Sequence, residues 1–329
     1  MQKAKIIVIA GSLVVCAQAF GNDEQDQCLL QALKSADQST TAEQIRAECT
    51  TVDVVASSDG STDYEQGAIR ERLRFESAAE DSPFVFTPHL PNFIGWSSFD
   101  PNQAPFTAIT GNPETVKDDE LVFQVSFKAP IWQQMFGTNL KTYFAYTSKS
   151  WWQLSNDDFS SPFRETNYMP EVFVRGTQQR RLFADVALEG WTLGFVHQSN
   201  GREQALSRSW DRILGRYALR LNSKLSLLGE VWYRIPEDEA DDDNPFEHRY
   251  YGYGDFRLVW TPNRSTFTAL LRPGTQELSY ELSWSYPIND VFRLHASYYD
   301  GYGESLLDYD QEIQRFTVGV SVSDFFRQP

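Results

Sequence analysis

Hydrophobic and polar residues alternate with a period of two along most of the chain after residue 83. In ELVFQVSFK, residues 120–128, every odd-numbered residue is apolar, whereas the even-numbered ones include Gln124, Ser126 and Lys128. The segment ELSYELSWSYP, residues 277–287, alternates in the same way, and segments 224–235 and 315–326 repeat the pattern, the last with Phe316 and Phe326 on its apolar face. Because successive side chains of a strand point to opposite faces, each segment is predicted to be a β-strand.

The connections between these segments alternate in length. Short turns are expected near residues 222–224, 261–264 and 287–290, and longer loops at 99–118, 153–164, 200–208, 237–248 and 301–313. The polar faces carry full charges, and aromatic residues make up 14% of the chain, including 9 Trp and 15 Tyr, which suits the aromatic girdles of a membrane barrel. A soluble β-sandwich would also alternate. We predict an all-β fold, an antiparallel transmembrane outer-membrane β-barrel of about twelve strands over residues 83–329.

The first 82 residues differ from the barrel region. Lys3 and Lys5, an apolar run and a small-x-small site ending at Ala19 predict a secretory signal peptide over residues 1–19. Residues 20–82 are expected to be periplasmic. Helical spacing predicts a small helical hairpin, for which one disulfide between Cys28 and Cys49 is expected, and the acidic, aperiodic residues 50–82 predict a flexible linker.

Charge and hydropathy narrow the class of partner. The formal net charge of −16 argues against nucleic acid, whose phosphates would repel the protein. After the predicted signal peptide, no apolar run is long enough for a membrane-spanning helix, so the sequence predicts that any membrane span is made by strands.

One polar group is expected on the apolar face of the barrel wall. In WTLGFVHQS, residues 191–199, His197 and Ser199 share a face with Phe195. If the loop 200–208 closes symmetrically, Ser199 lies opposite Ser209 and His197 opposite Asp211, with side chains about 5 Å apart. A lone histidine at a strand end would be an ordinary surface residue. Three polar residues pointing toward lipid together indicate a functional site, because the aqueous barrel interior is available to polar side chains.

The chemistry that fits these residues is nucleophilic acyl transfer. A serine hydroxyl is a weak nucleophile until a neighbouring base accepts its proton, and a histidine does this when a third group orients its ring. We assign Ser199 as the nucleophile, His197 as the base and Asp211 as the orienting residue, with the Gly201 N–H as a donor to the developing oxyanion. A site on the outer wall receives molecules that lie in the membrane. The substrate is therefore expected to be a lipid ester.

Several separate motifs in this order resemble the outer-membrane phospholipase A family of Gram-negative bacteria. They are HQSNGR (197–202), SRSW (207–210), SWWQLSN (150–156), SPFRETNY (161–168), DDNP (242–245) and GYGESLLDY (301–309). The resemblance covers about residues 83–326. It implies a twelve-stranded barrel that hydrolyses sn-1 and sn-2 acyl esters of membrane phospholipids and lysophospholipids.

The resemblance also implies that activity depends on calcium and on homodimer formation. The implied Ca²⁺ ligands are the Arg202 carbonyl and the Ser207 hydroxyl, joined by the carbonyl of Ser160 of the partner subunit. Asp243 matches an acidic position associated with a second calcium site. Few neutral oxygens imply weak binding of the ion.

The chain departs from the family pattern at three positions. Asp211 replaces the usual asparagine, Gln204 replaces an acidic residue of the second calcium site beside Glu203, and Ser148 replaces a glutamine of the dimer interface. These changes leave open the strength of dimerisation and the second site. Two alternatives to the enzyme stay open from the sequence, namely a pore or receptor and a lipid-binding adhesive barrel in which Ser199 has no role.

Overall fold

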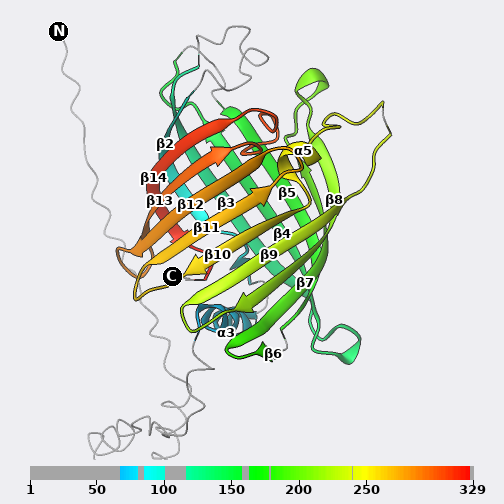
Figure 1. Cartoon of the computed structure of the whole chain (residues 1–329), viewed down its shortest axis with the longest axis vertical. Helices are drawn as coiled ribbons and strands as arrows, with labels where there is room; N and C mark the ends of the chain where they lie inside the picture. Colours follow the sequence, from blue (N-terminus) through cyan, green and yellow to red (C-terminus); the bar gives the residue numbers. More distant parts are fainter. Residues whose placement is uncertain are drawn as a thin grey trace, which may run out of the picture. The chain divides into compact units, whose positions relative to one another are not determined.

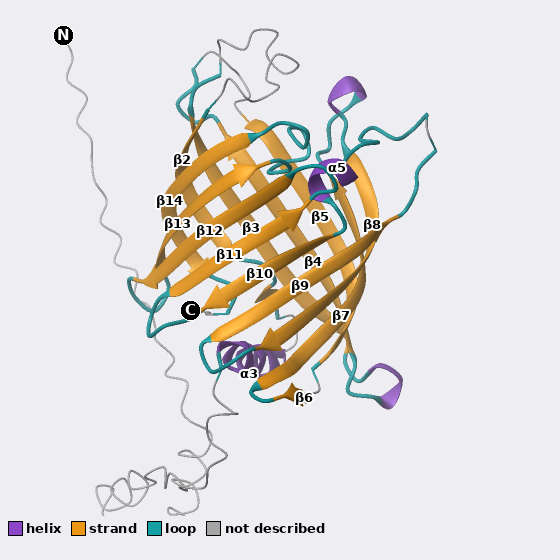
Figure 2. Ribbon diagram, in the orientation of Figure 1, coloured by secondary structure: helices purple, strands orange, loops and turns teal. Residues whose placement is uncertain are grey.

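The computed structural model describes residues 67–80, 85–100, 116–157, 163–177, 179–238 and 240–326. The predicted signal peptide, the helical hairpin and the Cys28–Cys49 disulfide lie outside these residues. Strands dominate the described part of the chain (Figure 2). The elements are α3 (Ala68–Glu80), β1 (Thr87–Pro88), β2 (Asn92–Phe99), β3 (Asp119–Trp132), η4 (Met135–Gly137), β4 (Lys141–Trp152), β5 (Phe163–Gly176), β6 (Arg180–Phe183), β7 (Val186–Ser199), η5 (Gln204–Leu206), β8 (Ser209–Arg220), β9 (Leu225–Arg234), α5 (His248–Tyr251), β10 (Gly254–Trp260), β11 (Thr266–Pro273), β12 (Leu278–Pro287), β13 (Arg293–Gly301) and β14 (Ile313–Ser323).

Twelve of the described strands form a closed antiparallel ring (Figure 1). Each pairs with the next along the chain from β2 to β14, with β6 bypassed, and β14 pairs back to β2. The short strands β1 and β6 only add to β3 and β7. The ring confirms the predicted twelve-stranded barrel. None of the described helices is long and apolar enough to cross a membrane.

The connections differ between the two ends of the barrel. At one end, called the turn end here, short connections such as 221–224 and 261–265 join the strands. At the other, the loop end, longer stretches of sequence separate successive strands, namely residues 100–118, 153–162, 200–208, 235–253 and 302–312. Both sets agree with the turns and loops predicted from the sequence.

The two faces of each strand show the alternation of apolar and polar residues that the sequence predicts. In β12, Leu278 and Leu282 are 56% and 51% exposed on the outer wall, whereas Ser279 and Ser285 are buried in the lumen. In β3, Val125 is exposed and Lys128 is fully buried. Large apolar side chains are therefore presented outward, where the hydrocarbon of a membrane would cover them.

Charged side chains fill the lumen as ion pairs. Arg216 of β8 pairs with Glu171 of β5 and Glu230 of β9, and Arg272 pairs with Asp255 at 2.8 Å. A cavity of about 420 Å³ remains between these groups. Buried charges need such partners because an isolated charge removed from water is very costly.

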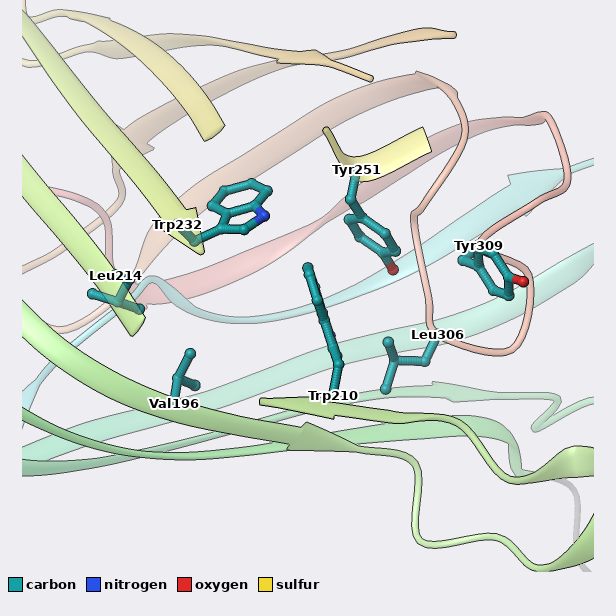
Figure 3. Close-up of a cluster of buried hydrophobic side chains, with 7 residues drawn as sticks. All are labelled: Val196, Trp210, Leu214, Trp232, Tyr251, Leu306 and Tyr309. Atoms are coloured by element: carbon teal, nitrogen blue, oxygen red, sulfur yellow. The ribbon is translucent and has the colours of Figure 1, made fainter. Parts of the chain in front are cut away.

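Aromatic side chains close the lumen toward the loop end. Trp210 and Trp232 from the wall pack edge to face, with ring centroids 6.1 Å apart, and Tyr251 of α5 packs on Trp210 (Figure 3). Leu306 and Tyr309, from the loop 302–312, complete this cluster. The GYGESLLDY motif thus forms part of an internal cap.

The helix α3 lies inside the barrel at the turn end and corrects one expectation from the sequence. Residues 50–82 were expected to form a flexible linker, but residues 68–80 of that segment form a helix (Figure 1). Glu76 is 2% exposed and binds Lys128 of β3 and Arg175 of β5, both at 2.6 Å. Glu80 binds Lys141 of β4 at 2.6 Å. The charged residues that suggested a solvated linker instead form ion pairs with charged residues of the barrel wall.

An apolar contact complements these ion pairs. Ile69 is 5% exposed and packs with Val259 of β10 and with Phe326, which follows β14. Phe326 was expected on the outer apolar face of the last strand. That expectation is wrong, because β14 ends at Ser323 and the chain then turns Phe326 into the lumen beneath α3.

Candidate active site

His197 and Asp211 face each other across β7 and β8 on the outer wall. The register pairs His197 with Asp211 and Ser199 with Ser209, as the symmetric loop predicted. His197 Nδ1 lies 2.8 Å from Asp211 Oδ1, and their side chains are 43% and 38% exposed. The carboxylate therefore accepts a hydrogen bond from the imidazole, which leaves Nε2 as the acceptor. This is the contact that an orienting residue makes with a base.

Ser199 lies two residues after His197 on the same face of β7. It is partly exposed, opposite Ser209 on one side and Tyr168 of β5 on the other. Within the described residues, Ser199 makes no hydrogen bond with His197. The base and its orienting residue are thus paired, whereas the contact between nucleophile and base needs a rearrangement of side chains. Catalytic hydrogen bonds of this kind often tighten only when substrate binds.

The loop that follows Ser199 is held by the buried side chain of Asn200. Its Nδ2 donates to the Leu206 carbonyl at 2.8 Å, and its Oδ1 accepts from the backbone N–H groups of Arg202 and Arg208. Three bonds from one amide fix the chain on both sides of Gly201. The Asn-Gly pair is therefore more than a turn signal, because the asparagine organises the whole loop.

Gly201 adopts a backbone conformation that favours glycine. Its φ is +63°, and a Cβ at this position would lie 3.2 Å from Tyr168 Cε2. The Gly201 N–H donates no hydrogen bond within the described part of the chain. A free N–H next to the proposed nucleophile is what an oxyanion donor requires.

A clamp that the sequence analysis missed ties this loop to the start of β5. Arg202 Nε donates to Glu165 Oε2 at 3.2 Å, and its Nη2 donates to the carbonyls of Phe163 and Arg164. Glu165 is fully buried and also accepts from Asn167 at 2.7 Å. Glu165 lies in the SPFRETNY motif, and a glutamate inside a strand indicates that a positively charged partner is needed. Only the fold identifies that partner as Arg202.

Oxygen groups that could hold a cation gather beside the same loop. Ser207 Oγ donates to Asp243 Oδ2 at 2.7 Å, so two of the predicted calcium residues are in contact. Ser160 lies outside the described residues, and within them no group of three or more His, Cys, Asp or Glu side chains could hold a metal. Hydroxyl, carbonyl and carboxylate oxygens are nevertheless the donors that Ca²⁺ prefers, so the residues fit a weak site.

The acidic connection that follows β9 lies near Asp211 and Asp243 at the loop end. Burial raises the pKa of Glu237, Arg234 lowers it, and the carboxylates of Asp242, Asp243 and Asp211 raise it further. The net shift is upward. This segment therefore adds negative potential near Asp211 and Asp243, which favours a cation over an anion.

Ser148 lies on the wall that carries these residues. It pairs with Tyr168 of β5, and Tyr168 pairs in turn with Ser199. A subunit packed against Ser148 would therefore adjoin the loop 200–208. This is the position at which the family resemblance implies a glutamine of the dimer interface.

The ring and its outer surface define the class of the protein as an outer-membrane β-barrel with a polar site on its lipid-facing wall. A sequence profile described as Phospholipase A1 matches residues 69–322, a span that includes most of α3. The chain is 35% identical over 253 residues to phospholipase A1 of Escherichia coli (strain K12), covering 75% of this chain and 84% of the relative. It is 34% identical over 250 residues to a protein of Neisseria meningitidis serogroup B described as a putative phospholipase A1, covering 72% and 65%.

Solved structures agree with these relatives. Outer membrane phospholipase A from Escherichia coli superposes with a TM-score of 0.69 at 34% identity, covering 74% of this chain and all of that one. The Salmonella typhi outer membrane phospholipase dimer with bound calcium gives 0.70 at 34% identity, covering 76% and 97%. The chain belongs to the phospholipase A1 family. It is a phospholipase of the outer membrane.

Proposed function

We propose that this phospholipase cleaves acyl esters of membrane lipids with Ser199 as nucleophile, His197 as general base and Asp211 as the residue that orients the base. One observation carries the proposal. The 2.8 Å contact between His197 Nδ1 and Asp211 Oδ1 lies on the outer wall, with Ser199 on the same face. A barrel has no structural need for this pair on its lipid-facing side.

The chemical steps follow from the positions of these groups. His197 Nε2 takes the Ser199 proton as Oγ attacks the ester carbonyl carbon, and the negative charge that develops on the carbonyl oxygen is stabilised by the Gly201 N–H. Asp211 stabilises the imidazolium. The C–O bond then breaks, His197 protonates the leaving glycerol oxygen, and the acyl group stays on Ser199. A water molecule, deprotonated by His197, releases the fatty acid and restores the serine.

The position of the site on the wall determines which lipids reach it. A lipid that diffuses along the membrane meets Ser199 with its acyl ester near the interface, at the end of β7. Phospholipids cleaved at sn-1 or sn-2, and lysophospholipids, are the substrates we propose. The lumen is a poor route for substrate, because α3 and the aromatic cluster occupy its two ends.

Calcium and a second subunit complete the proposal. The Arg202 carbonyl and Ser207 would hold the ion together with Ser160 of the partner subunit, and Asp243 would support it through its bond to Ser207. A bound calcium ion would supply positive charge that polarises the ester carbonyl. The clamp from Arg202 to Glu165 fixes the loop that presents these oxygens. The Salmonella typhi relative, a dimer with bound calcium, supports both features.

The proposal is tested by following fatty-acid release from phospholipid in detergent micelles, with calcium or with a chelator. We expect hydrolysis that needs calcium, that is lost in Ser199→Ala, and that is retained in Ser209→Ala, a matched serine opposite it on the same face. Chemical cross-linking with and without calcium measures the dimer. Hydrolysis that survives Ser199→Ala would overturn the assignment of the nucleophile, and equal rates with calcium and chelator would overturn the role of the ion.

A further inference from the structure

A second polar group lies on the outer wall, far from the one described above. Asp300, the penultimate residue of β13, pairs with Tyr280 of β12 and Gln314 of β14. These neighbours share its face, and Tyr280 is 36% exposed there. In the ring, β13 is five strands from β8 and six from β7, so this group lies on the opposite side of the barrel (Figure 1).

The side chains of this group converge on one carboxylate oxygen. The hydroxyls of Tyr280 and Tyr298 donate to Asp300 Oδ2 at 3.0 and 3.1 Å, and Gln314 Nε2 lies 3.4 Å from the same oxygen. No described side chain binds Oδ1, and none of the ion pairs among the described residues involves Asp300. Oδ1 is therefore open to a partner from outside the described residues.

The location limits what can supply that partner. The group is at the loop end of β12, β13 and β14, where the strands leave the membrane and where tyrosines collect in barrels. A carboxylate at this depth is stabilised by a cation, and the molecules that surround it are lipids. Phosphate or sugar groups alone bring no positive charge. A lipid headgroup that ends in an amine does carry a positive charge.

The two tyrosines provide more than hydrogen bonds. Their ring centroids are 6.2 Å apart with planes at 52°, beside the carboxylate. An ammonium group donates up to three hydrogen bonds and is attracted to the faces of aromatic rings within about 6 Å. Asp300 and the two rings together suit such a group better than they suit a metal ion, which would prefer several oxygen ligands.

We propose that Asp300, Tyr280 and Tyr298 form a binding site for the primary ammonium of a lipid headgroup, such as that of a phosphatidylethanolamine, on the wall opposite the acyl-transfer site. The site does not depend on the proposed catalytic residues. It would retain amine-bearing lipids next to the barrel while the opposite wall remains free for substrate and for a second subunit.

The test uses the full-length protein in nanodiscs of equal amounts of dialkyl ether phosphatidylethanolamine and phosphatidylglycerol, which no esterase can cleave. Native mass spectrometry after mild detergent release measures the ratio of the two lipids that stay bound. We expect the wild type to retain the amine lipid preferentially. Asp300→Asn and the double variant Tyr280→Phe with Tyr298→Phe should each lower that preference about two- to fivefold, the range expected for an exposed cation contact.

Two controls match these variants. Asp310→Asn removes an exposed carboxylate from the loop that joins β13 to β14, and Tyr233→Phe removes a hydroxyl from an exposed tyrosine at the loop end of β9. Both should retain the wild-type ratio. An unchanged ratio in Asp300→Asn, with the fold verified by heat-dependent gel mobility, would overturn the proposal. A preference that EDTA abolishes would also overturn it, because a bridging metal would then hold the lipid.

Discussion

Replacement of Asp211 separates the charge of this residue from its hydrogen bond. Asp211→Asn keeps an oxygen that can accept from His197 Nδ1 but removes the negative charge, whereas Asp211→Ala removes both. At about 4 Å, a carboxylate and an imidazolium attract each other by roughly 1 kcal/mol in water and roughly 4 kcal/mol near a protein surface. Both side chains are more than a third exposed, at 43% and 38%, so solvent screening favours the lower half of that range.

These magnitudes give a specific order of activities. Loss of about 1 to 2 kcal/mol in Asp211→Asn predicts a kcat roughly five- to thirtyfold lower than that of the wild type. Loss of the accepting atom costs roughly a further 1.5 to 3 kcal/mol, so Asp211→Ala should lose at least about seventyfold in kcat. The assay is fatty-acid release at saturating calcium and phospholipid. Asp238→Asn, an exposed carboxylate of the neighbouring acidic loop, is the charge-matched control and should retain activity.

The orienting role of Asp211 would be refuted by equal losses in the two variants. Equal losses would mean that the charge alone matters, or that both changes disturb the fold. Heat-dependent gel mobility distinguishes these cases, because a disturbed barrel unfolds at a lower temperature. Full activity in Asp211→Ala would exclude any catalytic role for the residue.

The described contacts make four further predictions. Gly201→Ala forces a Cβ to within 3.2 Å of Tyr168 at a positive φ, so hydrolysis should fall at least about tenfold with little change in barrel stability; a fully active variant would contradict the oxyanion role. Asp243→Asn should weaken the apparent calcium affinity roughly tenfold while the rate at saturating calcium is retained, and an unchanged calcium titration would exclude Asp243 from the site. Glu76→Gln leaves Lys128 unpaired in the lumen and should cost roughly 3 kcal/mol of unfolding free energy in urea, whereas the exposed Glu71→Gln should cost little. His89, between β1 and β2, lies in the lumen with its Nε2 3.4 Å from Glu171 Oε2. Burial and nearby cations lower the pKa of His89 to about 4, despite Glu171, so the free energy of unfolding should be greatest above pH 6.5 and fall as the pH drops toward 4; pH-independent unfolding would contradict this prediction.

The free energy of unfolding changes with pH in the same direction for two groups of the lumen, His89 and Glu76. His89 is neutral in the folded protein at a pH where the unfolded chain already binds a proton, so acid favours unfolding between about 6.5 and 4. Burial alone would raise the pKa of Glu76, but Arg175, Lys128 and Arg72 hold it well below its usual value. Its contribution is therefore present above the unfolded carboxyl pKa and is lost as the pH falls further.

The sequence predicted the wall of the barrel well, because lipid imposes a strict rule on it. Every second side chain must be apolar, and a shift of one residue would turn all the charges outward. The alternation of side chains along each strand therefore predicted that His197, Ser199 and Asp211 share one face, and the assumption of a symmetric loop 200–208 predicted their register. The same rule would have placed Asp300 outward, but a single acidic residue at a strand end carries no signal by itself.

The contents of the lumen could not be predicted in this way. Inside this barrel, charged walls bury much of the helix, so α3 carries only a short apolar patch around Ile69 and its sequence resembles that of a solvated segment. Its partners Lys128 and Arg175 are distant in sequence, and only closure of the ring brings them together. The bond from Arg202 to Glu165 has the same origin, since it joins residues 37 apart through neighbouring strands.

Covalent labelling tests most directly whether Ser199 is a nucleophile that faces the membrane. The detergent-solubilised, calcium-loaded protein is treated with an alkyl fluorophosphonate, and the modified residue is located by peptide mass spectrometry. We predict a single adduct on Ser199, whose formation is strongly slowed in His197→Phe. An adduct on another residue, or labelling of Ser199 at the same rate without His197, would contradict the proposed site.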